Sequence, residues 1–481
     1  MTYEITSGRV LGVEGRLVRI HTAMNDTGRF RIIGIPEAAA KEMEVRVRAA
    51  IQTLGLGTTP GPGRGAEVVI DAASMRASTT GHDLAVAISI LAADHRIPAQ
   101  APDVVWLGDL SLDGQLRAIR GALPIVMAAT RDPGAGVAIV PLDNLAEVQD
   151  ASGILALGAR SLLEVVQWIQ FKGIENLTAK VDLDLAWNRQ DYDFTEVRGL
   201  AGPRRALEIA AAGGHSILMV GRPGSGRSML ARRLATILPP MTKQERIEVT
   251  SIRSAAGLMR PREGLVWDRP FRSPHHTASD LAMTGGGTHC RPGEYSLAHA
   301  GVLFLDELPE WRRNVLETLR APIRDGQIGL ATREAVVRMP ARFHLVGAAN
   351  PCPCGFRGSD RCRCTDLEAT RYWGRIQSIL PEFEIVVRVD PEREVALLPA
   401  GEPSSVVRNR VGAAVERRKA RRPGFDVEMV SLVDPDSALG SSLSERFRVV
   451  KIARTIADLE GSAKIRPEHL VEAAALVRLA N

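Results

Sequence analysis

The residues best suited to chemistry form a glycine-rich octet, Gly221-Arg222-Pro223-Gly224-Ser225-Gly226-Arg227-Ser228. An apolar run at 217–220 precedes the octet and a helical pattern starting at Met229 follows it, which predicts a strand, a loop and a helix. Glycine lets backbone N–H groups approach phosphate oxygens, and the N-terminus of a helix favours negative charge. We therefore expect the octet and Met229 to bind ATP, with Ser228 as a ligand of Mg²⁺.

Position 227 departs from the usual pattern of such loops. They carry a lysine here, which reaches the outer phosphates as a compact point charge. Arg227 brings a larger planar fork that fits the same cradle less readily. The sequence thus predicts nucleotide binding and leaves hydrolysis as the open question.

Two adjacent carboxylates, Asp306 and Glu307, end the apolar run at 301–305. A buried strand that ends in acids is the partner that a phosphate-binding loop requires, and this one comes about 80 residues after the octet. We expect Asp306 to hold the Mg²⁺ shell together with Ser228. Glu307 is the candidate catalytic group that polarises the attacking water.

A polar amide, Asn350, ends a third apolar run at 343–349. At the tip of a strand beside the loop it could orient the attacking water or bind the γ-phosphate, which makes it a catalytic candidate. The alternative is an asparagine that only opens a turn before Pro351. Three strand ends that carry the loop, the acid pair and the amide, in this order, predict an ATPase core.

Four of the five cysteines, Cys352, Cys354, Cys362 and Cys364, form two Cys-x-Cys pairs. Four thiolates are enough for a zinc site, although tight pairs constrain its tetrahedral geometry. The alternative is a reduced loop without metal. Cys290 stands apart and is interpreted as incidental.

Composition places the chain among aliphatic-rich globular proteins. It has 481 residues, 45% hydrophobic, 24% charged and 4% aromatic, with a net charge of +5. This length suggests about three domains. We find neither an apolar run near the roughly 20 residues of a membrane span nor a signal peptide, so we expect a cytoplasmic protein. The basic run at 417–422 favours a solvated helix end over a contact with nucleic acid.

The N-terminal third alternates β-patterned and helical runs, which predicts a compact α/β domain. Gly81-His82-Asp83 introduces an apolar helix at 84–93, and we expect these polar residues to cap it rather than to form a site. From about residue 395 the patterns are helical.

Longer blocks resemble the magnesium-chelatase-like AAA+ ATPases of the ComM (YifB) type across the whole chain. The blocks are residues 108–114, 204–215, 272–279 (Arg-Ser-Pro-His-His-Thr-Ala-Ser), 296–309, 350–355 (Asn-Pro-Cys-Pro-Cys-Gly) and 453–459. They are long and specific. The resemblance implies an α/β fold with an N-terminal domain similar to the Lon protease (S5-like) domain at 1–170, a linker at 171–195, a central AAA+ P-loop αβα sandwich at 196–394 and a C-terminal helical lid at 395–481.

Members of this family look like hexameric, ATP-driven motors that remodel branched DNA during recombination, and the chelatase relatives drive metal insertion. For this chain the resemblance implies ATP and Mg²⁺ as cofactors, DNA as a partner and a homo-oligomer. It also implies a nucleotide-sensing arginine in the lid, at Arg446 or Arg448.

The chain departs from the family a second time at 380–385. The family's Leu-Leu-Asp-Arg-Ile-Asp stands here as Leu-Pro-Glu-Phe-Glu-Ile, without its arginine. Because arginines acting in trans neutralise charge on the γ-phosphate, its loss would slow turnover. Phe383 is thus interpreted as a second altered position, and Arg371 and Arg375 remain as substitutes, with Arg375 as the catalytic candidate.

Three other functions compete with the motor. The first is a nucleotide-binding scaffold with weak or no hydrolysis, motivated by Arg227. The second is a chelatase-like motor, which needs partner subunits. The third is a peptidase in the N-terminal domain, which needs a Ser–Lys pair. Ser78 is present, but no lysine lies between Lys41 and Lys172, which disfavours a peptidase.

Overall fold

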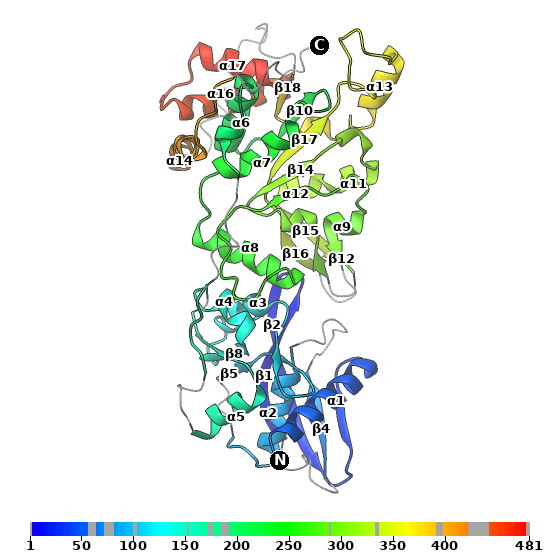
Figure 1. Cartoon of the computed structure of the whole chain (residues 1–481), viewed down its shortest axis with the longest axis vertical. Coiled ribbons are helices and arrows are strands. Elements are labelled where there is room, and N and C mark those ends of the chain that lie inside the picture. Colours follow the sequence, from blue (N-terminus) through cyan, green and yellow to red (C-terminus); the bar gives the residue numbers. More distant parts are fainter. Residues whose placement is uncertain are drawn as a thin grey trace.

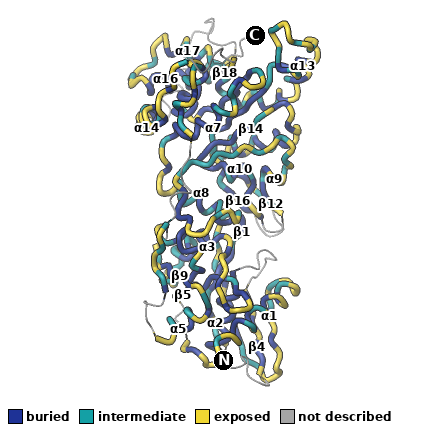
Figure 2. Tube along the Cα trace, viewed as in Figure 1, coloured by how far each residue is buried: buried dark blue, intermediate teal, exposed yellow. Residues whose placement is uncertain are grey.

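The computed structural model describes residues 2–55, 64–71, 81–99, 103–151, 153–171, 177–183, 192–287, 290–331, 336–390, 398–421 and 442–477. The molecule is elongated, with the N-terminal part at one end and the central and C-terminal parts at the other (Figure 1). Buried residues run along the strands of both large sheets (Figure 2). No helix in the described ranges is long and apolar enough to cross a membrane. Ser78 and most of the expected linker lie outside the described residues.

The described N-terminal residues form a seven-stranded mixed sheet. In spatial order its strands are β3 (Phe30–Ile33), β4 (Gly65–Ile70), β2 (Glu14–Asn25), β1 (Thr2–Leu11), β5 (Val104–Trp106), β8 (Val137–Pro141) and β9 (Leu155–Ala159). A small hairpin, β6 (Asp109–Leu110) and β7 (Leu116–Arg117), lies beside it. The helices are α1 (Glu37–Thr53), α2 (Asp83–Ala93), α3 (Ala122–Ala129), α4 (Leu142–Val148) and α5 (Leu162–Phe171). The predicted α/β character of this part is confirmed.

The capping role expected at the start of α2 is wrong. His82 occupies the N-cap position, but its side chain makes no capping hydrogen bond. Ser7 donates to the backbone oxygen of Trp106, so His82 Nδ1 donates to Ser7 Oγ, 2.9 Å away. Asp83 is fully buried and accepts hydrogen bonds from Arg46. Both polar side chains point into the packed domain because α2 is buried on all sides, which the apolar composition of its sequence already indicates.

The central part contains a second sheet, whose five strands in the described residues are all parallel. In spatial order they are β11 (Phe271–Arg272), β14 (Val302–Leu305), β17 (His344–Ala349), β10 (Ile217–Gly221) and β18 (Ile385–Val389). Alternate residues of β10 enter different cores: Ile217 and Met219 pack with α6 (Ala201–Gly213), α7 (Arg227–Ile237) and the C-terminal helices, and Leu218 and Val220 pack on the other face. The sheet is therefore the middle of three layers.

The second face of this sheet is covered by short elements between β10 and β18. They include α9 (Asp280–Thr284), α10 (Glu294–Leu297), α11 (Arg313–Thr318), α12 (Arg320–Asp325) and α13 (Asp366–Gly374), whereas the longer α8 (Lys243–Ala256) contacts α3 of the N-terminal part. Two hairpins extend from this layer, β12 (Gly285–Gly286) with β13 (Arg291–Pro292) and β15 (Gln327–Ala331) with β16 (Val336–Pro340). Short 3₁₀ turns lie at Phe194–Glu196, Leu308–Glu310 and Leu380–Glu382.

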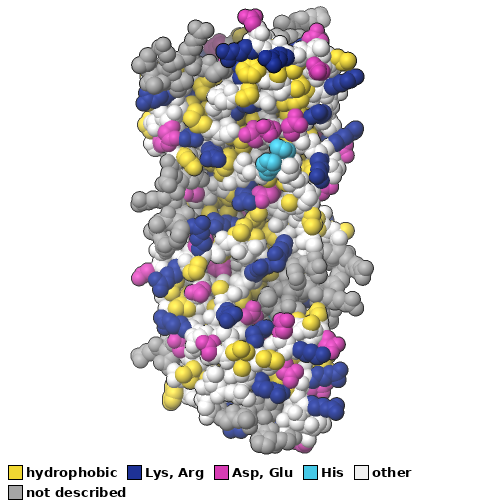
Figure 3. All heavy atoms as spheres, turned by 45° about the vertical axis from the view of Figure 1, so that its right-hand side comes forward, with side chains coloured by type: hydrophobic (Ala, Val, Ile, Leu, Met, Phe, Trp, Pro, Cys, Tyr) yellow, Lys and Arg dark blue, Asp and Glu magenta, His cyan; other side chains and the backbone are white. Residues whose placement is uncertain are grey.

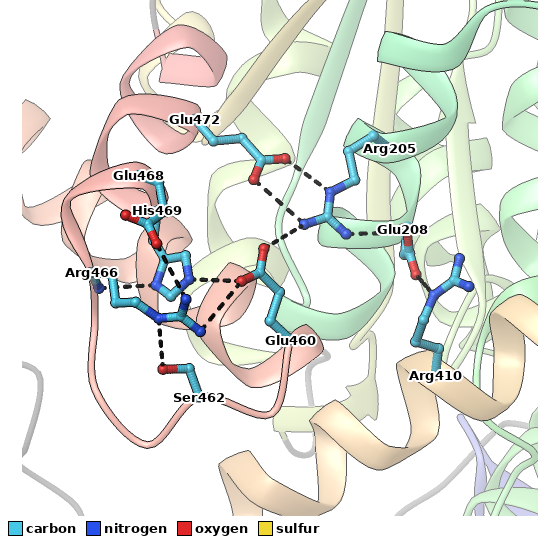
Figure 4. A network of polar contacts seen from close by, with 9 residues as sticks. All are labelled: Arg205, Glu208, Arg410, Glu460, Ser462, Arg466, Glu468, His469 and Glu472. Carbon is cyan, nitrogen blue, oxygen red and sulfur yellow. Dashed lines mark hydrogen bonds and ion pairs between the residues drawn. The ribbon is translucent and has the colours of Figure 1, made fainter.

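The C-terminal helices are α14 (Ser404–Ala420), α16 (Leu443–Leu459) and α17 (Pro467–Val477). Of these, α14 and α16 pack against α6, and α17 packs on α16. Figure 4 shows the polar network that joins them. Arg205 of α6 donates to Glu472 of α17 at 2.9 and 3.4 Å and lies 3.8 Å from Glu460, which follows α16. Glu208 of α6 accepts from Arg410 of α14. The C-terminal helices are thereby held to the helix that leads into β10.

The basic residues at the end of α14 form contacts within the C-terminal helices. Arg417 donates to the backbone oxygen of Asp458 at 2.7 Å, and Arg421 pairs with the Asp458 carboxylate. Lys419 pairs with Glu416 on the same helix at 2.9 Å. These contacts favour the structural interpretation of the run over a nucleic-acid contact, at least for the three basic residues they involve.

The N-terminal part docks on α8 of the central part. The backbone N–H of Gly121, at the start of α3, donates to the backbone oxygen of Ser254 at 3.1 Å. Leu11 packs with Cys290, Val337 and Met339 from the two hairpins. Cys290 is therefore a small packing residue at this junction, as expected from its isolation in the sequence.

A buried carboxyl at this junction gives a prediction on stability. Burial raises the pKa of Glu147 from 4.5 to about 7, and Asn144 donates to the carboxyl at 2.7 Å. Between these two values the folded protein keeps a proton that the unfolded chain has released, so the free energy of unfolding falls as pH rises and is lowest above pH 7. Glu147→Gln keeps the acceptor oxygen and removes the charge, and should stabilise the protein by about 3 kcal/mol above pH 7.

Denaturant unfolding of both proteins from pH 4 to 9 checks this expectation. The wild type should lose about 3 kcal/mol more stability across the window than the glutamine variant. Glu164→Gln, at a surface ion pair with Arg160, is the matched control. Parallel pH profiles for wild type and Glu147→Gln would contradict the assignment.

Candidate nucleotide-binding site

The three predicted strand ends meet at one edge of the parallel sheet. β10 lies between β17 and β18, and β17 pairs with β14 on its other side. The register aligns Val220 with Ala349 and Leu305 with Gly347, so the octet, Asp306 and Asn350 all follow the carboxyl ends of neighbouring strands. Ligands of open α/β sheets bind at this edge, where the strand order reverses.

The octet forms a tight loop between β10 and α7. Gly224 and Gly226 have φ angles of +77° and +92°, which favour glycine. A Cβ at Gly221 would lie 2.2 Å from the backbone oxygen of Val389, whereas a Cβ at Gly224 would meet no described atom within 4 Å. The Ser225 hydroxyl is buried and forms no hydrogen bond with any described residue. An open, glycine-lined concavity with an unpaired hydroxyl fits a phosphate group.

The candidate metal ligands lie together. Ser228, in the first turn of α7, donates its hydroxyl to Asp306 Oδ2 at 3.0 Å. Asp306 is held by its own backbone, because its carboxylate accepts from the N–H of Glu307 and its carbonyl from the indole of Trp311, both at 2.9 Å. One hydroxyl and one carboxylate at hydrogen-bond distance form the protein half of a Mg²⁺ site, which needs few protein ligands. These donors fit the ion.

Glu307 adopts an unusual backbone conformation. Its φ and ψ are +49° and +46°, in the left-handed region that side chains other than glycine rarely enter. The side chain is 53% exposed, and one oxygen lies 3.2 Å from Nδ1 of His276. Strained residues of this kind cluster at functional sites. The contact with His276 holds a loop side chain beside this carboxylate.

His275 and His276 lie in the loop after β11. Their ring centroids are 4.1 Å apart, and His275 is exposed. Figure 3 shows histidine side chains exposed next to acidic ones in the upper half of the molecule. No pattern in the sequence indicates the contact between His276 and Glu307, because it joins two loops that are distant in the chain.

Arg227 reaches across the loop to Asn350. Its Nη2 donates to Asn350 Oδ1 at 2.8 Å. Burial lowers the pKa of Arg227, and the charges of Asp306 and Glu307 oppose this shift. A guanidinium remains charged under such a shift, so a fixed positive charge lies beside the amide, Asp306 and Glu307. This is where the outer phosphates of a nucleotide on the octet would lie.

The other arginine candidates lie apart from this cluster. Arg375, at the end of α13, pairs with Glu310 at 3.0 Å, and these two residues line a pocket of 650 Å³ beside α11. Arg371 is exposed on α13. Arg446 and Arg448 begin α16, and Arg448 lines a pocket of 410 Å³ formed at the opposite, N-terminal edge of the strands. Arg448 is therefore not beside the octet of its own chain.

Phe383 is not an altered catalytic position. It is 1% exposed, and a Cβ at Gly347 of β17 would lie 2.7 Å from its ring. The neighbouring Glu382 is the residue whose side chain faces charged partners, since Arg324 lies 3.6 Å from it. The interpretation of Phe383 as the position of a lost arginine is therefore wrong, because Phe383 is a packing residue. The segment 380–385 still contains no arginine.

The four clustered cysteines come together next to the octet. All four sulfur atoms lie within 4.8 Å of one another, with 3.4 Å between Cys352 and Cys354 and 3.8 Å between Cys354 and Cys362. Tetrahedral zinc with Zn–S bonds near 2.3 Å separates its sulfurs by about 3.8 Å. Backbone N–H groups of Arg363 and Phe356 lower the pKa of the Cys354 thiol to about 6. The four sulfur atoms fit a zinc ion.

Comparison with known proteins identifies the family. The model "Magnesium chelatase, subunit ChlI" matches residues 193–397, "Subunit ChlI of Mg-chelatase" matches 18–144, and "Magnesium chelatase, subunit ChlI C-terminal" matches 436–476. The competence protein ComM of Haemophilus influenzae is 35% identical over 98% of this chain and 96% of its own length. The chain belongs to the magnesium-chelatase-like ComM (YifB) family.

Other relatives agree with this assignment. YifB of Escherichia coli is 36% identical over 95% of this chain and 92% of its own length. The magnesium-chelatase 38 kDa subunit of Rhodobacter capsulatus is 26% identical over 60% of this chain and 88% of its own length. The mixed α/β fold with its parallel sheet is consistent with an AAA+ protein of the chelatase type, and the family implies the use of nucleotide and Mg²⁺.

Proposed function

We propose that this protein binds ATP with Mg²⁺ on the octet and hydrolyses it. The observation that supports this most strongly is the pair of hydrogen bonds at one sheet edge, from Ser228 to Asp306 and from Arg227 to Asn350. Backbone N–H groups of residues 221–228 and the start of α7 hold the phosphates. Ser228 and Asp306 hold the metal, and Arg227 contacts the outer phosphates.

Glu307 acts as the general base in this proposal. Its exposed carboxylate accepts a proton from a water molecule as the water oxygen forms a bond to the γ-phosphorus and the bond to the β–γ bridging oxygen breaks. Asn350 positions that water through its amide. The fixed charge of Arg227 stabilises the negative charge on the transferred group.

We further propose that the protein is a ring-forming motor that remodels DNA. Family membership supports this role, and Arg448, which lines a pocket at the opposite edge of the strands from the octet, is free to act on a neighbouring copy in such a ring. In the face drawn in Figure 3, basic side chains are spread along the molecule rather than gathered into one patch. A path for DNA would therefore be completed by several copies.

The scaffold remains the second candidate because of one contact. Arg227 already bonds to Asn350, and a nucleotide must compete for both groups. If arginine keeps that bond, ATP would bind without turnover. A chelatase-like motor is weaker, since it requires further subunits to receive the metal.

Equilibrium binding of ATP tests the nucleotide site. Titration calorimetry on the full-length protein should give one ATP per chain in the presence of Mg²⁺, with at least about tenfold weaker binding when EDTA removes the ion. Mass measurement in the same buffer should give a complex of several chains with ATP. Equal affinity with and without Mg²⁺ would contradict the proposed metal pair.

We also propose zinc at Cys352, Cys354, Cys362 and Cys364, supported by their sulfur geometry. Metal analysis of the purified protein should find about one equivalent of zinc, because four thiolates complete a structural site. Cys362→Ser should lose it, and Cys290→Ser, in the distant packing cluster, should keep it. Well under one equivalent in the wild type would contradict the site.

A further inference from the structure

The loop that carries the four cysteines, residues 352–364, packs directly on the octet. Gly355, which follows Cys354, is buried and has a φ of +81°. A Cβ at this position would lie 2.6 Å from Cδ and 3.0 Å from Cγ of Pro223, the third residue of the octet. Only glycine permits this approach. The backbone beside the thiols therefore packs on the proline ring of the loop that would hold the phosphates.

The same loop begins next to Asn350 of the candidate site and ends at α13. Cys352 lies two residues after Asn350, and Cys364 lies two residues before α13. Pro351, between Asn350 and Cys352, accepts a hydrogen bond from the indole of Trp373 on α13 at 3.1 Å. Within the loop, the N–H of Cys354 donates to the sulfur of Cys364 at 3.4 Å. The thiols thus join the tip of β17 to the start of α13.

We propose that metal at the four cysteines and nucleotide on the octet stabilise each other's binding. This inference rests on the proposed nucleotide and zinc sites. The metal fixes the distance between Cys352 and Cys364, so Gly355 stays on Pro223 and Asn350 stays beside Arg227. Without the metal, the loop loses the bonds that hold its two ends, and the octet loses the surface that supports Pro223.

Coupling of this kind is reciprocal. If metal raises the affinity for ATP by a given factor, ATP must raise the affinity for metal by the same factor. A contact that holds one loop against another accounts for a factor of about ten, within the range of measured couplings. ATP affinity and metal retention are therefore two independent measurements of the same coupling free energy.

Gly355→Ala tests the contact without touching a thiol. Its matched control is Gly358→Ala, because Gly358 has nearly the same φ, +82°, and a Cβ there would meet no described atom within 4 Å. Both substitutions strain the backbone equally, but only the first pushes Pro223 away. Gly355→Ala should keep one zinc and bind ATP about tenfold more weakly, while Gly358→Ala should match the wild type in both respects.

Metal retention is measured by the extraction of zinc from full-length protein with a chelating dye. ATP should slow or weaken extraction about tenfold in the wild type and have little effect in Gly355→Ala. If the wild type binds ATP equally well with and without zinc, the coupling is wrong and the nucleotide site stands. If the zinc-loaded wild type binds no ATP, the proposed function fails first.

Discussion

Glu307→Gln is expected to lower steady-state ATP hydrolysis by at least about 100-fold, which is the usual contribution of a positioned general base. Glutamine has the same shape but cannot accept the proton of the attacking water. The metal pair is formed by Ser228 and Asp306 without the Glu307 side chain, so the pair and the octet remain intact. ATP affinity should therefore change little, and the variant should hold unhydrolysed ATP.

Phosphate release and nucleotide binding on the same preparations separate these two effects. Glu317→Gln is the control, because Glu317 is an exposed glutamate on α11 that pairs only with Arg313 among the described residues. It should hydrolyse ATP as the wild type does. Equal rates for Glu307→Gln and wild type would remove Glu307 from the mechanism.

Arg227→Lys is expected to raise ATP turnover about tenfold, equivalent to 1.4 kcal/mol of transition-state stabilisation. The guanidinium donates to Asn350 at 2.8 Å and spreads its charge over a plane. A lysine ammonium is a compact charge that can follow the γ-phosphate and would free the amide of Asn350 to orient water. The gain should appear in kcat with little change in ATP affinity.

Arg232→Lys provides the matched control, since Arg232 is exposed on the same helix. It should leave turnover unchanged. Turnover by the wild type as fast as by Arg227→Lys would exclude the scaffold and show that arginine serves in place of the usual lysine. A wild type without turnover whose lysine variant hydrolyses ATP would establish the scaffold instead.

Much of the candidate site could be predicted because it lies at the ends of strands. Glycines, acids and an amide that follow short apolar runs can be recognised in the sequence, and parallel strands bring such ends to one edge. The contacts from Ser228 to Asp306 and from Arg227 to Asn350 bring these side chains together at that edge. The helical character of the C-terminal residues was also predicted, since apolar residues recur at helical spacing in α16.

The features that could not be predicted depend on contacts between segments that are distant in the sequence. The caps expected at His82 and Asp83 are buried partners of Ser7 and Arg46, because α2 is enclosed by the sheet. The burial of Phe383 could not be predicted, because a shift of one residue along a short segment changes which side chain enters the core. The approach of Gly355 to Pro223 could not be predicted either, because a single glycine is its only trace in the sequence.

ATP hydrolysis by the purified wild type, with and without branched DNA at low salt, tests the central claim most directly. Low salt strengthens contacts to DNA phosphates, so a DNA-dependent motor should respond most clearly there. We predict measurable hydrolysis that branched DNA raises several-fold and that is lost in Glu307→Gln. Hydrolysis that is absent, or that DNA does not change, would contradict the account of this protein as a DNA-remodelling ATPase.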